Sequence, residues 1–302
     1  MPEMIRSVLV AGAGWTGRQI ALQTSAFGVP TFLSDTREAA VADALQWAAG
    51  QADSNVASGE WPADRADAVR KNLRAAGEAE EVDLAIESVP EQASIKRRAL
   101  QGLSRRHPPP AVIASNSSYF LPSQLSKYVD GPERFAHLHF HVPVWQATLV
   151  DIVPGPGCDA EVIETLERFA EQIGQTPIVQ TVENPGYVFN WMLQALLAAA
   201  LDLIDRGVAE PEQIDAAWRT VTKMPIGPIG IIDRIGVDVV HQVLRNAQWA
   251  ENDPRLDRLI AILQPLVDAD RLGWKTGRGF YEYGDKTGER PQVNPELGRH
   301  RS

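Results

Sequence analysis

The chain carries the glycine-rich stretch Gly12-Ala13-Gly14-Trp15-Thr16-Gly17 directly after the apolar run Val8-Leu9-Val10-Ala11, and a helical pattern over residues 15–26 begins within it. In such a strand, turn and helix unit, the first glycine permits a tight turn and the second lets the backbone approach a pyrophosphate. The third lets the helix pack closely on the sheet. The N–H groups at the start of the helix then face the phosphates. The spacing predicts a dinucleotide site formed by Gly12, Gly14, Trp15, Thr16 and Gly17.

A second apolar run, residues 31–35, ends in Asp35. In dinucleotide-binding folds, a carboxylate at this place accepts hydrogen bonds from the adenosine ribose diol. Its negative charge also repels a 2′-phosphate, so Asp35 favours NAD over NADP. Arg37 is the opposing observation, because a nearby arginine can hold that phosphate. On the position of Asp35, the sequence predicts NAD as the cofactor.

The composition is that of a soluble globular protein. The chain has 302 residues, of which 44% are apolar and 23% charged, so about two domains are expected. The net charge of −10 argues against nucleic acid or a membrane surface as partner, although a local basic patch remains compatible with a phosphorylated ligand. The most apolar stretch, residues 192–204, is interrupted by Gln194 and Asp202 and falls short of the ~18 residues of a membrane span. A buried helix is expected there.

A cytoplasmic location is expected from two features. The single cysteine, Cys158, cannot form an internal disulfide and fits a reducing compartment. Residues 1–6 lack the basic region and apolar core of a signal peptide, and an apolar run of strand type follows almost at once.

Short β-like runs alternate with helical patterns in the first half of the chain, which predicts a parallel, doubly wound sheet of the Rossmann type. The runs cover residues 8–11, 31–35, 82–87, 111–115 and 134–140. Residues 39–76 have a polar, helical composition with a break near residues 59–62, which indicates a helical hairpin inserted into this fold. Two further runs, residues 149–153 and 177–182, flank a helix at residues 160–173 and are expected to complete the sheet.

The composition shifts at Asn184-Pro185-Gly186, which separates an expected NAD-binding domain, residues 1–186, from an all-α domain, residues 187–302. The second domain is expected to hold the dimer contact and the substrate site. Its helical patterns cover residues 187–205, 211–222, 237–247 and 255–268, and residues 284–302 form a polar tail. Because the helix at residues 187–205 is apolar on nearly all sides, it has more surface to cover than one domain supplies. A homodimer is therefore expected.

His137, His139 and His141 alternate along the run Arg134-Phe135-Ala136-His137-Leu138-His139-Phe140-His141, so they share one face if this run is a strand. A dehydrogenase that oxidises an alcohol needs a base for the hydroxyl proton, and histidine suits that task. Two alternatives remain open at this point. Histidines at this spacing can hold a metal ion with Asp151 as a third ligand, although His137 and His141 lie too far apart to bind one ion together. The three can also form a polar sheet edge.

Several separated motifs resemble the 3-hydroxyacyl-CoA dehydrogenase family, and the similarity extends from the first strand to about Tyr283. In the first half, the matching motifs besides the glycine stretch are Ile86-Glu87-Ser88-Val89-Pro90-Glu91, Ser115-Asn116-Ser117-Ser118, Leu138-His139-Phe140 with Pro143, and Leu149-Val150-Asp151. In the second half, they are Pro185-Gly186-Tyr187-Val188-Phe189-Asn190, Ile214-Asp215-Ala216-Ala217, Pro225-Ile226-Gly227-Pro228, Asp233-Arg234-Ile235-Gly236-Val237-Asp238 and Lys275-Thr276-Gly277-Arg278-Gly279-Phe280-Tyr281. This many ordered matches is far more specific than the glycine stretch alone.

The resemblance implies roles for individual residues. His139 matches the family's catalytic base, and Asp151 stands where a family glutamate orients that imidazole. Ser118 and Asn190 match residues that hydrogen-bond the reacting oxygen. An oriented base with two neutral donors stabilises developing alkoxide character without a metal, so no metal is expected for the reaction. The resemblance also places Glu91, Lys96 and Asn116 in the cofactor-binding set.

The departures from the family pattern concern the substrate. Asp151 is one methylene shorter than the usual glutamate, and we expect it to reach His139 directly or through one water. His141-Val142 replaces a Phe-Asn pair, and Trp191 replaces an arginine; Trp145 adds bulk near the expected site. If the substrate is a CoA thioester, its phosphates need cations. The candidates are Lys71, Arg74, Lys96, Arg97 and Arg98, of which Lys96 best matches a family lysine.

Two readings of the function follow from this resemblance. The leading expectation is an NAD-dependent dehydrogenase that interconverts a 3-hydroxyacyl thioester, such as 3-hydroxyacyl-CoA, with its 3-oxo form. A free small 3-hydroxy acid, like gulonate or carnitine, is the alternative substrate. The rival class is a non-catalytic NAD-binding protein that kept the fold and lost turnover. The presence of His139, Ser118 and Asn190 together argues against it.

Overall fold

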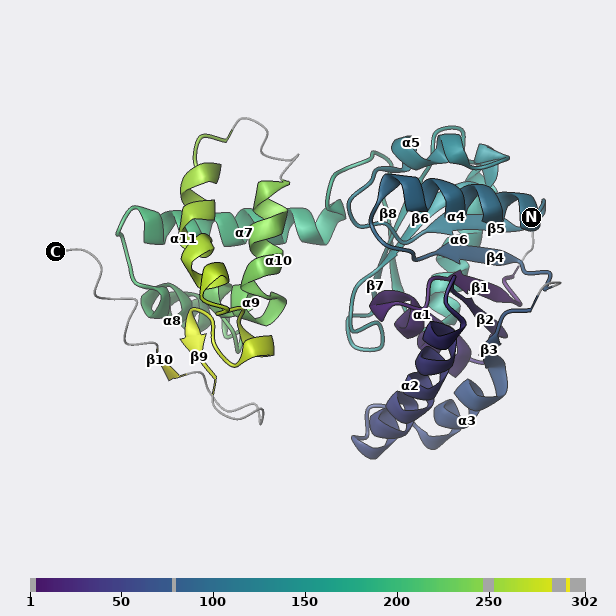
Figure 1. Ribbon diagram of the computed structural model, residues 1–302, viewed down its shortest axis with the longest axis horizontal. Helices are drawn as coiled ribbons and strands as arrows, with labels where there is room; N and C mark the ends of the chain where they lie inside the picture. The colour runs from purple at the N-terminus through teal and green to yellow at the C-terminus, as the bar shows by residue number, and fades with distance from the viewer. Residues whose placement is uncertain (1–3, 78–79, 247–252, 284–291, 294–302) are drawn as a thin grey trace. The chain divides into compact units, whose positions relative to one another are not determined.

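The computed structural model describes residues 4–77, 80–246, 253–283 and 292–293. The chain forms two compact units, Met1–Tyr187 and Val188–Ser302, and each is described by itself (Figure 1). The division lies one residue beyond the expected boundary at Gly186. Of the expected tail at residues 284–302, only Gln292 and Val293 are among the described residues.

An eight-stranded sheet in the order β3-β2-β1-β4-β5-β6-β7-β8 forms the centre of the first unit. The strands are β1 (Val8–Ala11), β2 (Thr31–Ser34), β3 (Leu73–Ala75), β4 (Leu84–Glu87), β5 (Val112–Ser115), β6 (Phe135–Phe140), β7 (Leu149–Pro154) and β8 (Thr176–Val179). All residues of β1, β4, β5 and β6 are buried, as is usual for strands covered on both faces by helices. The prediction of a Rossmann-type sheet is confirmed.

The pairs among β1, β2, β4, β5 and β6 are parallel, as predicted, whereas β7, which was expected to complete the sheet, lies antiparallel to β6. Only residues 141–148 connect the two strands. A parallel pair needs a crossover of a dozen or more residues, usually with a helix, so a connection this short returns the chain beside β6 in the opposite direction. The strand β8 then pairs parallel to β7.

Helices cover both faces of the sheet (Figure 1). They are α1 (Trp15–Ala26), α2 (Glu38–Ala57), α3 (Ala63–Asn72), α4 (Ala93–Arg106), α5 (Pro122–Leu125) and α6 (Ala160–Gln172). Buried side chains of α1, α2 and α6 share one apolar core with the sheet, and those of α4 pack in another. The expected helical hairpin is present as α2 and α3. Sequence reasoning missed β3, which has only three residues, all at least partly exposed.

The second unit is mainly helical, with α7 (Tyr187–Asp205), whose first residue still belongs to the first unit, followed by α8 (Pro211–Thr222), α9 (Pro228–Ile235), α10 (Val237–Arg245) and α11 (Leu256–Asp268). Sequence reasoning missed α9. It also missed the pair of two-residue strands β9 (Tyr281–Glu282) and β10 (Gln292–Val293), so the domain is not strictly all-α. Two buried carboxylates connect these elements. Asp215 accepts hydrogen bonds from the backbone of α9, and Asp233 accepts them from Phe280 and Tyr281.

Helix α7 is long and apolar enough to cross a membrane by length and composition, but only 28% of its most apolar window is buried. Leu197 and Leu201 pack in the core of the second unit. Val188, Phe189 and Met192, near the start of the helix, are exposed. Within residues 192–204, where a buried helix was expected, Leu197, Ala198, Ala200 and Leu201 are buried, whereas Met192 is exposed.

Candidate active site

The glycine stretch forms the turn between β1 and α1 as expected. Gly12 has a φ of 114°, which favours glycine, and its N–H donates to the Ser34 carbonyl at 2.7 Å. A Cβ on Gly17 would collide with the Gly12 carbonyl oxygen, whereas a Cβ on Gly14 would meet no atom within 4 Å. The first and third glycines are thus required by packing. The second borders open space, as a backbone that approaches a pyrophosphate must.

Trp15 and Thr16 lie in the first turn of α1, directly after this loop. The indole of Trp15 is exposed, and its ring lies 5.9 Å from that of Trp47 on α2. Their backbone N–H groups belong to a helix N-terminus, which favours an anionic ligand.

Asp35 follows the end of β2 and is held against the glycine loop. One carboxylate oxygen accepts the N–H of Ala13 at 2.9 Å, and the other accepts the N–H of Arg37 at 3.0 Å. Both bonds fix the carboxylate beside the loop that would hold the pyrophosphate. The residues present therefore fit NAD, with Asp35 placed to accept the ribose hydroxyls.

His139 on β6 and Asp151 on β7 lie directly opposite each other in the antiparallel pair. Side chains at opposite positions of such a pair have Cβ atoms about 5 Å apart. His139 Nδ1 lies 3.1 Å from Asp151 Oδ2, so the expected contact is present and direct. The pairing of the strands explains why the shorter aspartate suffices. The alternative of a polar sheet edge is wrong, because β6 lies between β5 and β7 with all its residues buried.

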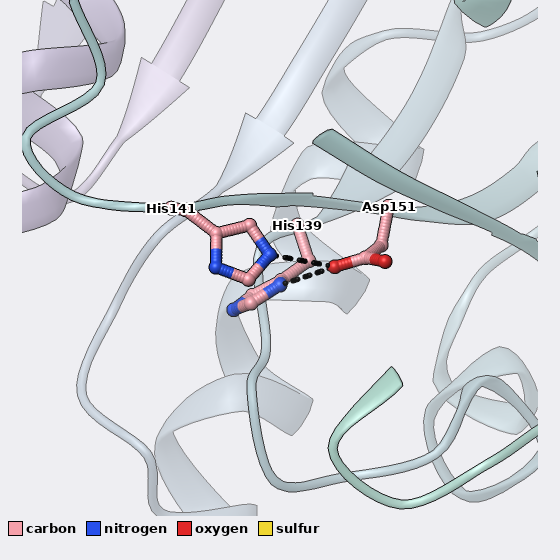
Figure 2. Close-up of side chains that lie close together, drawn as sticks. All are labelled: His139, His141 and Asp151. Atoms are coloured by element: carbon pink, nitrogen blue, oxygen red, sulfur yellow. Dashed lines mark hydrogen bonds and ion pairs between the residues drawn. The ribbon is translucent and has the colours of Figure 1, made fainter. Parts of the chain in front are cut away.

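His141 lies one residue beyond the end of β6 and contacts the same carboxylate oxygen. Its Nε2 is 2.9 Å from Asp151 Oδ2, and Gln180 Nε2 donates to Oδ1 at 3.2 Å. Figure 2 shows both imidazole rings directed at one oxygen. Burial by itself would raise the pKa of Asp151, but the hydrogen bonds to the two histidines outweigh it and lower that pKa. Asp151 is a buried carboxylate shared by two imidazoles.

Tyr187 fixes the ring of His139 from one side. The two rings stack with centroids 4.4 Å apart and planes inclined by 12°. The Tyr187 hydroxyl donates to the Ser117 carbonyl and lies 3.0 Å from His137 Nδ1. Tyr187 has a φ of 56°, an uncommon conformation for an aromatic residue. Sequence reasoning did not assign Tyr187 to the site. Its position directly after Pro185-Gly186, inside a motif that matches the family, is the sequence feature that could have identified it.

The arrangement suits His139 for proton transfer. A proton on Nδ1, donated to Asp151, leaves a lone pair on Nε2 that can accept a proton. Burial lowers the pKa of His139, and the charge of His141 lowers it further. The bond to Asp151, with the charges of Asp151 and Glu91, raises it, and the net direction is downward. The imidazole is therefore neutral at neutral pH, as a base must be.

The buried Lys96 and the exposed Glu91 form a network next to the loop that carries Ser118. Lys96 Nζ lies 2.8 Å from Glu87 and 2.9 Å from Glu91. Glu91 Oε1 in turn accepts the Ser117 hydroxyl and the N–H of Tyr119 at 2.9 Å. The residues on both sides of Ser118 are thus fixed by Glu91, while Ser118 itself is exposed. This geometry supports a positioning role for Glu91 and Lys96.

The other expected site residues lie elsewhere. Asn116 Oδ1 accepts the N–H of Phe140 at 2.9 Å, which ties the end of β5 to β6. Asn190 is half-buried on the first turns of α7, in the second unit. Trp145 packs against Trp47 with ring centroids 6.2 Å apart, and Trp191 is exposed on α7. Of the four expected catalytic residues, His139 and Asp151 are the two whose side chains contact each other in the first unit.

Two family models cover most of the chain. The NAD-binding domain of 3-hydroxyacyl-CoA dehydrogenase matches residues 7–183, and the C-terminal domain of that enzyme matches residues 186–283. The chain is 29% identical over 286 residues to a probable 3-hydroxybutyryl-CoA dehydrogenase of Bacillus subtilis (strain 168), which covers 94% of this chain and 99% of the relative.

Solved structures show the same similarity. A diketoreductase, described as acting on dicarbonyl compounds, is 32% identical with a TM-score of 0.81, covering 93% of this chain and 100% of its own. The (S)-3-hydroxybutyryl-CoA dehydrogenase of Ralstonia eutropha is 27% identical with a TM-score of 0.83 and the same coverage.

Proposed function

Since this chain belongs to the 3-hydroxyacyl-CoA dehydrogenase family, we propose that it interconverts a 3-hydroxyacyl thioester and its 3-oxo form. The chain is an NAD-dependent oxidoreductase with a Rossmann-type domain and a helical C-terminal domain. The observation that supports the reaction is the direct bond between His139 and the buried carboxylate of Asp151. A buried imidazole whose far nitrogen carries a lone pair is a general base in the form this oxidation needs.

His139 Nε2 takes the proton of the 3-hydroxyl group as hydride leaves C3. NAD, when bound, accepts this hydride. Asp151 stabilises the imidazolium as it forms and holds the productive tautomer, and Tyr187 keeps the ring in place. Ser118 and Asn190 donate hydrogen bonds to the reacting oxygen, which stabilises its developing negative charge. In the reverse direction the imidazolium returns the proton to the alkoxide.

A free small 3-hydroxy acid or dicarbonyl compound is the second candidate substrate. Lys96, the best expected ligand for a CoA phosphate, is only 1% exposed and is enclosed by Glu87 and Glu91. It is therefore not placed to meet a phosphate. The expected cations that remain exposed are Lys71, Arg74, Arg97 and Arg98. The similarity to a diketoreductase points the same way, because the substrates of that protein are described as dicarbonyl compounds.

The oxidation of NADH decides between these substrates. We expect turnover with acetoacetyl-CoA to exceed turnover with 3-dehydrocarnitine and 3-dehydrogulonate. Activity with a free acid alone would select the second candidate. His139→Gln should lower kcat by about 10²–10⁴ while the affinity for NADH stays near that of the wild type. A fully active His139→Gln variant would contradict the assigned base.

We also infer self-association through the second unit and a cytoplasmic location. The exposed Val188 and Met192 at the start of α7 support a dimer, whereas Leu197 lies in the core and is unsuited to test it. Light scattering with size-exclusion chromatography should give a dimer at micromolar concentration, and Met192→Glu should weaken it. The single thiol, Cys158, supports the location.

A further inference from the structure

The three side chains in Figure 2 bring three potential metal-ligand atoms together. One potential ligand atom from each of His139, His141 and Asp151 lies within 4.8 Å of those of the other two residues. The carboxylate oxygen is 3.1 Å from the first nitrogen and 2.9 Å from the second. The ligands come from β6, from the residue after it and from β7, so the strand pairing sets their separation.

The two oxygen-to-nitrogen separations, 3.1 Å and 2.9 Å, are close to those of a zinc site. With bonds of about 2.0–2.1 Å to a tetrahedral Zn²⁺, neighbouring ligand atoms lie roughly 3.3 Å apart. The two oxygen-to-nitrogen distances need to widen by only a few tenths of an ångström to reach that value. Gln180 holds the other carboxylate oxygen at 3.2 Å, as an outer hydrogen bond does for many metal-bound carboxylates.

The kind of ligand selects the kind of metal. Two imidazole nitrogens and one carboxylate oxygen suit Zn²⁺, Co²⁺, Ni²⁺ or Cu²⁺, whereas Mg²⁺ and Ca²⁺ prefer oxygen ligands throughout. The side chains are 6%, 11% and 0% exposed in the order His139, His141, Asp151, so an ion enters past the histidines and displaces little water. Three protein ligands leave a fourth position for water or substrate.

We propose that His139, His141 and Asp151 form a binding site for a divalent transition-metal ion of the zinc class, and that occupation of this site inhibits the enzyme. The binding site follows from the geometry alone. The inhibition rests on the proposed function, because it requires His139 to be the base. His141 makes this possible, since it supplies the third ligand to a pair that would otherwise offer only two.

Inhibition follows from where the protons are. In the metal-free site, the Nδ1 proton of His139 and the Nε2 proton of His141 are donated to Asp151. The metal takes the lone pair at each of these nitrogens, so the neutral ring of His139 must carry its proton on its other nitrogen. For His139 that other nitrogen is Nε2. Its lone pair is then occupied by a proton, and the ring cannot accept the proton of the substrate hydroxyl.

Metal binding is tested first, without reference to activity. The full chain is freed of metal with a chelator and titrated with Co²⁺, whose visible absorption reports coordination, and Zn²⁺ is used to displace it. We expect one ion per chain and at least a tenfold loss of affinity in His141→Phe, which removes one ligand. His141→Asn is the second variant in case His141→Phe does not fold, as judged by circular dichroism. Cys158→Ser is the matched control, because a thiolate is the competing explanation for bound zinc.

The proposal is overturned if the wild type takes up no ion, if His141→Phe and His141→Asn bind it as tightly as the wild type, or if Cys158→Ser abolishes binding. The second measurement is NADH oxidation with and without metal. Zn²⁺ should inhibit, Mg²⁺ should not, and a chelator should restore the rate. Binding without inhibition overturns the inhibitory role and also contradicts His139 as the base. If the protein binds no metal ion but still needs His139 for activity, the metal site is overturned and the proposed function stands.

Discussion

Asp151→Asn tests whether the carboxylate acts through its charge. The substitution preserves size and leaves one oxygen to accept hydrogen bonds. In the structure, Oδ2 accepts from two imidazoles and Oδ1 accepts from Gln180. An asparagine oxygen in the Oδ2 position turns its NH₂ toward the Gln180 NH₂, and rotation of the Gln180 amide relieves that conflict. The tautomer of His139 is then retained and the negative charge is lost.

The magnitude follows from the distance. A unit charge 3.1 Å from the forming imidazolium is worth about 5 kcal/mol at an effective dielectric constant of about 20. The asparagine dipole replaces part of this, so about 3–5 kcal/mol of transition-state stabilisation should disappear, or about 10²–10⁴ in kcat. If the asparagine instead turns its NH₂ toward the histidines, His139 must carry its proton on Nε2, and the loss reaches the upper end of that range.

The assay is steady-state NADH oxidation with the best substrate of the screen, together with the affinity for NADH from fluorescence. We expect kcat to fall while the NADH affinity stays within about a factor of three of the wild type. His139→Gln combined with Asp151→Asn should be no slower than His139→Gln alone, because both residues act as one unit. Gln180→Ala is the matched control, since it removes a neighbour of Asp151 without changing its charge.

A kcat for Asp151→Asn within about threefold of the wild-type value would refute this reasoning. It would mean that the carboxylate neither stabilises the imidazolium nor selects its tautomer. Additive losses in the double variant would contradict the coupling of His139 and Asp151, even if each single variant were slow.

Three further predictions concern the cofactor, the base and the turn. Asp35→Ser should reduce the preference for NADH over NADPH by about tenfold or more, about 1.4 kcal/mol, and a wild type that prefers NADPH would contradict the role of Asp35. The kcat/KM for oxidation should rise with pH through a midpoint below 6.5, because burial and His141 lower the pKa of His139 more than Asp151 and Glu91 raise it; a midpoint well above 6.5 would contradict this. Gly17→Ala should lower the free energy of unfolding in urea by about 1–3 kcal/mol, since its Cβ collides with the Gly12 carbonyl, whereas Gly14→Ala should not.

The parts of the protein that sequence alone could predict are those set by local rules. The glycine stretch predicts its own turn, because Gly12 and Gly17 meet backbone atoms that leave no space for a side chain. The alternation of apolar runs and helical patterns predicts the sheet and most helices, since burial imposes a period on each segment separately. Short elements were missed, such as β3 and α9, because a few residues carry too little periodicity. His139 and Asp151 were found by their motifs.

What only the tertiary structure decided is which side chains meet across strands. The antiparallel return of β7 beside β6 places Asp151 opposite His139, and the same register lets His141 reach the carboxylate. The stacking of Tyr187 on His139 and the enclosure of Lys96 also join residues that are distant in the chain. Periodicity describes the face on which a residue lies, not which strand becomes its neighbour. Contacts between strands therefore depend on connection lengths and on packing of the whole sheet, and these fix the chemistry of the site.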